Sequence, residues 1–147
     1  RTVQFTNEGR SLVITYLETS NIAMWSVNPW AKKWERSVTN ISFCSGFSRI
    51  SPDGLSILID NVRNGTDAYH LRNGQYITTF HGPVTGGKVK QVAYNGDGSL
   101  VIQGSDKGIV YISDFTTTAP IQTLMHSTHG ELVQAITVGC YLNPIDK

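Results

Sequence analysis

The sequence predicts an all-β protein made of three consecutive four-stranded antiparallel units. A polar turn ending in glycine recurs three times, as Thr6–Gly9, Ser51–Gly54 and Asn95–Gly98, and the three glycines lie 45 and 44 residues apart. Short apolar runs of strand length flank each turn. No stretch keeps the 3.6-residue periodicity of an amphipathic helix for more than a turn or two.

Each unit supplies four strands in the same order. The first strand precedes the turn glycine, at residues 3–5, 48–50 and 92–94. The second strand follows this glycine, at residues 12–16, 57–59 and 100–102. After a polar turn comes the third strand, at residues 22–27, 67–71 and 109–115. The fourth strand closes the unit, at residues 34–38, 76–80 and 121–125.

Four short strands in each period of about 45 residues are typical of β-propeller blades. We therefore expect a single propeller segment, 1–147, with blades over about 1–40, 41–83 and 84–128. Residues 131–138 contain Glu131–Ile136, which echoes Thr2–Phe5, so we expect an orphan first strand of a fourth blade there.

A closed propeller needs about four blades, and each blade buries its faces against its neighbours. Three blades would leave two apolar sheet faces exposed. We therefore expect this chain to pair with further blades, from a second copy or from the rest of a parent protein. Since the chain opens on Arg1 rather than Met, we also expect it to be processed or cut from a longer protein.

Composition narrows the class of partner. Hydrophobic residues make up 39%, charged residues 16%, and the formal net charge is +1, which gives no electrostatic reason to expect nucleic acid. No apolar run reaches the roughly 20 residues that span a bilayer, so no membrane association is expected.

Two cysteines, Cys44 and Cys140, and the lack of a visible signal peptide favour a cytoplasmic location. Glycosylation sequons at Asn40 and Asn64 occur about as often as chance allows and do not establish secretion.

The run Gly104–Asp114 resembles the second half of a WD repeat, with Ser113 in the position of the family's tryptophan. The run Asn21–Ser26 keeps that tryptophan as Trp25, and Ser51–Gly54 is the turn that such repeats carry between their first two strands. Residues 61–136 also resemble divergent WD-repeat proteins of fungi.

No copy of the WD repeat is complete. The family's structural hydrogen-bond set joins a turn Asp to His, Ser or Thr and to Trp. Asp106 is present without its Trp, and Trp25 is accompanied by Glu18 instead of Asp. In the second copy, His70 lies near the tryptophan position and Arg63 stands where the family usually has Asp. The resemblance covers nearly the whole chain and implies a propeller whose stabilising network is incomplete.

The resemblance implies a non-catalytic protein-interaction or scaffold module. Its recognition face would be formed by the loops after the second and fourth strands. These loops carry Glu18, Arg63, Asn64, His81, Asp106, Lys107 and His129.

A second candidate patch combines aromatic and basic residues in one loop, at Trp30, Lys32, Lys33 and Trp34. Such interleaving can stack on bases or bind phosphates, but it also suits a solvated loop in which Trp34 covers the edge of a blade. Two alternatives stay open: a lectin-like propeller that binds carbohydrate or another small ligand, and a fragment of a propeller enzyme.

Other clusters suit ordinary loops better than sites. His126-Ser-Thr-His129 lacks the helical geometry that aligns paired histidine ligands, and Asn95–Ser99 lacks the carboxylates that calcium requires. No motif of nucleophilic or phosphate-binding chemistry occurs. We therefore expect no enzyme activity, no catalytic residues, no metal and no cofactor.

Overall fold

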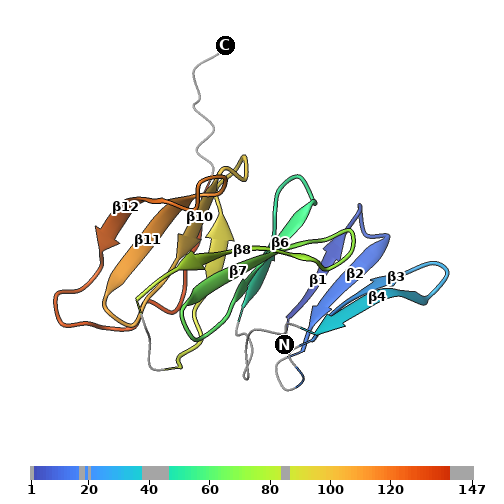
Figure 1. The fold of residues 1–147 in the computed structure, drawn as a ribbon, viewed down its shortest axis with the longest axis horizontal. Helices are drawn as coiled ribbons and strands as arrows, with labels where there is room; N and C mark the ends of the chain where they lie inside the picture. The colour runs from blue at the N-terminus through green and yellow to red at the C-terminus, as the bar shows by residue number, and fades with distance from the viewer. Residues whose placement is uncertain (1, 17–18, 20, 38–46, 84–86, 140–147) are drawn as a thin grey trace, which may run out of the picture.

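The computed structural model describes residues 2–16, 19, 21–37, 47–83 and 87–139. These residues form twelve β-strands in three four-stranded sheets and no helix (Figure 1). Within each sheet, strands that follow one another in the chain pair antiparallel. The all-β class and the three consecutive four-stranded antiparallel sheets are therefore confirmed. Among the described residues, nothing has the helical length and hydropathy needed to cross a bilayer.

The strands follow the predicted order. Sheet 1 consists of β1 (Thr2–Thr6), β2 (Ser11–Thr15), β3 (Asn21–Ser26) and β4 (Ala31–Ser37). Sheet 2 consists of β5 (Ser48–Ile50), β6 (Ser56–Asp60), β7 (Gly65–His70) and β8 (Tyr76–His81). Sheet 3 consists of β9 (Val92–Tyr94), β10 (Leu100–Gln103), β11 (Ile109–Asp114) and β12 (Pro120–Met125).

The turns between first and second strands have the predicted chemistry. Gly54 and Gly98 adopt φ values of 70° and 81°, in the left-handed region that favours glycine. The carboxylates of Asp53 and Asp97 accept hydrogen bonds from the backbone N–H groups of Leu55 and Ser99, at 2.9 and 2.8 Å. These contacts fix the reversal of the chain before each second strand.

The three sheets follow one another through the molecule, from β1–β4 at one end to β9–β12 at the other (Figure 1). Their first strands are neighbours, since β1 lies beside β5, and β5 lies beside β9. The first strands therefore approach one another, whereas β4 and β12 lie at the outer edges of sheets 1 and 3.

Two apolar clusters hold the sheets together. The first, between sheets 1 and 2, is built on Val13, Ile22, Ile57, Ile59, Tyr69 and Leu71. The second, between sheets 2 and 3, is built on Leu58, Ala68, Phe80, Val92, Tyr94 and Val101. Successive side chains of β6 alternate between the two clusters because side chains in a strand point to opposite faces. Sheet 2 is therefore covered on both faces, and every residue of β6 is buried.

The expected strand over residues 131–138 is not formed. This segment makes isolated contacts with sheet 3: the N–H of Gln91 donates to the carbonyl of Gln134 at 2.9 Å, and the N–H of Val133 donates to that of Ser105 at 2.7 Å. A strand requires a ladder of regular bonds to a partner. No second strand follows this segment within the described residues, so it lies against sheet 3 without becoming part of a sheet.

Candidate recognition site between the first strands

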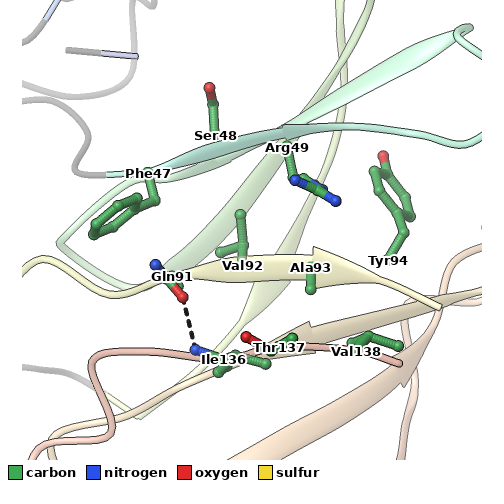
Figure 2. A pocket seen from close by; sticks show the side chains of 10 residues that line it. All are labelled: Phe47, Ser48, Arg49, Gln91, Val92, Ala93, Tyr94, Ile136, Thr137 and Val138. Atoms are coloured by element: carbon green, nitrogen blue, oxygen red, sulfur yellow. Dashed lines mark hydrogen bonds between the residues drawn. The ribbon is translucent and has the colours of Figure 1, made fainter. Parts of the chain in front are cut away.

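A hollow of about 300 Å³ lies between β5, β9 and residues 136–138 (Figure 2). Ten residues line it: three from the start of β5, Gln91 with all of β9, and three from the segment after sheet 3. In an antiparallel four-stranded meander, first strands start at the end of the sheet that carries the loops after the second and fourth strands. The hollow therefore borders the end at which the sequence predicts recognition.

Strand alternation sends the side chain of Arg49 into this hollow. On one side of Arg49, Ser48 accepts a hydrogen bond from the side-chain Nε2 of Gln4 at 2.7 Å, and its hydroxyl also contacts the hydroxyl of Thr2. On the other side, Ile50 packs against the cluster between sheets 1 and 2. Both neighbours are thus turned toward sheet 1, so Arg49 projects toward β9 instead (Figure 2).

Gln91 closes one side of the hollow. Its side-chain Oε1 accepts a hydrogen bond from the N–H of Ile136 at 2.7 Å, the contact dashed in Figure 2. With the bond from its own N–H to Gln134, this residue ties the segment after sheet 3 to the start of β9. Residues 136–138 are thereby held as the third wall.

The electrostatics of the hollow depend on Arg49. Its side chain is exposed, and it makes no hydrogen bond or ion pair with any residue that the structure describes. The hydroxyl of Tyr94 contacts that of Ser56 at 2.9 Å, and burial raises the pKa of Tyr94 far above its usual value. Tyr94 therefore stays neutral, and the guanidinium is the only charged group among the lining residues.

An arginine in this position suits an anionic ligand. The planar guanidinium presents paired donors that match the two oxygens of a carboxylate or a phosphate. Because the group has no partner among the described residues, a ligand would not have to displace an ion pair with any of them.

The structure brings some of the predicted loop residues together in sheet 2. The turn holding Arg63 and Asn64 lies beside the end of β8, where the carbonyl of Asn64 accepts a bond from the N–H of Gly82 at 2.8 Å. The carbonyl of His81 accepts a longer bond of 3.4 Å from the side chain of Gln103, in sheet 3. Glu18 and Asn40 lie outside the described residues, as do Cys44 and Cys140.

The predicted residues of sheet 3 form a separate group. Asp106 and Lys107 lie in the turn between β10 and β11, next to the loop after β12. The carbonyl of Gly108 there accepts a bond from the N–H of His126 at 2.7 Å. His129 is exposed, and its Nδ1 lies 3.2 Å from the hydroxyl of Thr128. None of these side chains lines the hollow.

The aromatic and basic patch is divided between two faces. Trp30 stacks on Trp25, with ring centroids 5.2 Å apart, and the Nζ of Lys32 lies 5.4 Å from the Trp25 ring. Trp34 packs against the cluster between sheets 1 and 2 instead, and its Nε1 donates to the carbonyl of Leu71 at 3.1 Å. The Nζ of Lys33 approaches the hydroxyl of Ser11 at 3.4 Å. The four residues do not form one binding surface.

Two buried polar contacts that join sheets 2 and 3 were not expected from the sequence. The carboxylate of Asp60 accepts a bond from the N–H of Lys90 at 2.8 Å and lies 3.8 Å from its Nζ. The hydroxyl of Thr66 donates to the side chain of Gln103 at 2.8 Å. Burial is the main cause that raises the pKa of Asp60 above its ordinary value. These contacts position β9, and with it the hollow.

Sequence reasoning missed Arg49 and Gln91 because it searched the loops and not the first strands. The sequence did contain a sign of this site, since Arg49 is the one charged residue in the three-residue strand Ser48–Ile50.

Within the described part of the chain, no three His, Cys, Asp or Glu side chains come close enough to hold a metal ion. No protein-family model matches this chain, and no curated protein matches it.

Proposed function

We propose that this chain is a non-catalytic protein-interaction module of the WD-repeat type, which binds an acidic segment of another protein at Arg49. Three consecutive four-stranded sheets with adjacent first strands support such a module. A fold does not identify a ligand. One observation therefore carries the proposal: an exposed guanidinium, which has no partner among the described residues, lies in the hollow between β5 and β9.

The ligand chemistry follows from this group. A carboxylate of Asp, Glu or a chain terminus can accept two parallel hydrogen bonds from Arg49. A hydrogen bond to a charged group contributes about 1.5–3 kcal/mol, which corresponds to a change of roughly 10- to 100-fold in affinity. Other contacts of the hollow would then set the sequence preference of the bound segment.

A peptide array tests the proposal. The acidic peptides that the wild-type chain retains are then titrated in solution with the wild-type, Arg49→Ala and Arg36→Ala chains, and the dissociation constants are compared. The control residue Arg36 is an exposed arginine on β4, so both variants lower the net charge equally. We expect the dissociation constant to rise about 10- to 100-fold for Arg49→Ala and less than about twofold for Arg36→Ala. Equal effects of the two variants, or equal binding of amide analogues of the peptides, would contradict the proposal.

Carbohydrate binding is a second candidate, favoured by the exposed Trp30 ring stacked on Trp25. Lectin units tend to repeat their binding aromatics, whereas the described parts of sheets 2 and 3 hold no second stacked aromatic pair. A glycan array with Trp30→Ala as the comparison distinguishes the two candidates, because Arg49→Ala would leave glycan binding unchanged.

A further inference from the structure

The chain makes the same kind of sheet-on-sheet interface twice. Sheet 1 packs on sheet 2, and sheet 2 packs on sheet 3, each through a buried apolar cluster. We call the face of a sheet that contacts the preceding sheet its N-side face, and the face that contacts the following sheet its C-side face. In sheet 2, Ile57 lies on the N-side face and Leu58 on the C-side face.

The N-side face repeats in register through all three sheets. The pair Ile50 and Ile57 in sheet 2 corresponds to Tyr94 and Val101 in sheet 3, and the four residues pack at the two internal interfaces. The same pairing recurs in sheet 1, where Phe5 is opposite Leu12.

In sheet 1 this N-side face has no sheet against it among the described residues. Phe5 is 68% exposed and its neighbour Val3 is 61% exposed. Beyond Leu12, the face continues to Trp25 on β3, which corresponds to the buried Tyr69 of sheet 2. Sheet 1 thus presents an apolar face of the kind that packs inside the molecule at two other places.

At the other end, the C-side face of sheet 3 has no sheet against it among the described residues. Val13 and Leu58 hold equivalent places in sheets 1 and 2, and both are buried against the following sheet. The equivalent residue of sheet 3 is Ile102, which lines an open apolar hollow of about 820 Å³ together with Val110, Ile112 and Leu124. Residues 132–139 border this hollow.

We propose that the N-side face of sheet 1 in one copy of this chain docks on the C-side face of sheet 3 in a second copy. The occupant is a second copy because this chain already pairs these two kinds of face at both internal interfaces. Two copies can make the contact twice, by two-fold symmetry, in a closed ring of six sheets. Large exposed apolar patches mark association surfaces, and this docking covers both of them. The inference goes beyond peptide binding at Arg49 and does not depend on it.

Light scattering coupled to gel filtration, run from about 1 to 200 µM, measures the docking directly because association depends on concentration. We expect a species of about twice 16.2 kDa for the wild-type chain. Phe5→Glu on sheet 1 and Leu124→Glu on sheet 3 each place a charge on one exposed face, so each should weaken association at least about tenfold. The matched control is Leu55→Glu, a change of a 67% exposed residue in the turn between β5 and β6.

A mixture of the two variants tests the pairing of faces. When Phe5→Glu and Leu124→Glu chains pair with each other, both charges meet at one interface and the other interface is wild type. We therefore expect the mixture to associate more tightly than either variant alone. Circular dichroism checks that each variant is folded.

Three results would overturn the proposal: a wild-type mass of 16.2 kDa at every concentration, an equal loss for Leu55→Glu, or a mixture that fails to associate. Arg49→Ala should form the pair normally, so failure of docking and failure of peptide binding are distinguishable.

Discussion

Trp25, Trp30 and Trp34 lie close together in the sequence, yet the fold gives them different surroundings. The register between β3 and β4 shifts between Met24 and Trp25, so that Trp34 pairs with Met24 and Lys32 pairs with Trp25. Residues two apart in a regular strand share a face, but a bulge between them breaks this rule. The patch predicted from the sequence is divided for this reason, and composition gives no sign of where the bulge falls.

The carboxylate of Asp53 stabilises the turn between β5 and β6. It accepts bonds from the hydroxyl of Ser51 at 2.5 Å and from the N–H of Leu55 at 2.9 Å. These bonds favour the ionised form and lower the pKa of Asp53 below its ordinary value of 3.8. Its contribution to stability is therefore complete above about pH 4 and is lost as the pH falls through the lowered pKa.

Asp53→Asn should remove this pH dependence while keeping an oxygen acceptor for Leu55. At neutral pH we expect a loss of less than about 1 kcal/mol, because the group is largely exposed. Below pH 4 the wild-type and variant free energies of unfolding should converge, as measured by urea denaturation at several pH values. Because Asp60 is present in both chains, its raised pKa does not affect the comparison. Parallel curves from pH 7 to pH 3 would contradict this account.

At the level of elements, the regular strands were the most predictable part. β5 and β9 coincide with the predicted residues 48–50 and 92–94, because each precedes a turn whose glycine is unmistakable. β4 begins at Ala31 and not at Trp34, since its edge position lets Lys32 and Lys33 pair through the backbone while their side chains stay solvated. Residues 131–138 have the composition of a strand, but a strand also requires a partner, which local sequence does not reveal.

Gly104→Ala tests how firmly residues 131–138 are held against sheet 3. A Cβ at this position would lie 2.1 Å from the carbonyl oxygen of Val133, so the segment must move away. We expect the amide hydrogens of Val133 and Gln91 to exchange at least about tenfold faster, because their bonds to Ser105 and Gln134 are disturbed.

Gly82→Ala is the matched control for this variant. Its Cβ would meet nothing closer than 3.5 Å, which is an ordinary contact. Unchanged exchange at Val133 in Gly104→Ala would mean that the segment is not held by the contacts described above.

At the scale of the whole molecule, the sheets differ in how completely they are covered. Sheet 2 has a neighbour on each face, whereas every residue of β12 is exposed and β4 is mostly exposed. Hydrogen exchange followed by mass spectrometry should therefore find amides of β6 and β7 protected at least about tenfold more than those of β4 and β12. Uniform protection would indicate instead that the three sheets open as one cooperative unit.

The sequence predicts more of the overall arrangement of the sheets than of the candidate site. Turn spacing predicted three units and their strand order, whereas the burial of β6 on both faces is seen only in the structure. The hollow was not predictable because it depends on three segments that are far apart in the sequence. The position of β9 within it depends on Asp60, Lys90, Thr66 and Gln103, whose contacts cross between sheets.

The three units pair their strands in the same register, and this limits how such a chain can gain or lose units. Because equivalent residues occupy equivalent faces, duplication of one complete period would insert a sheet whose two faces already match its new neighbours. A duplication of half a period would instead place polar edges where an apolar face is needed. Growth of this architecture over evolution should therefore proceed in whole periods of about 45 residues, and the loops of each added period would be free to diverge.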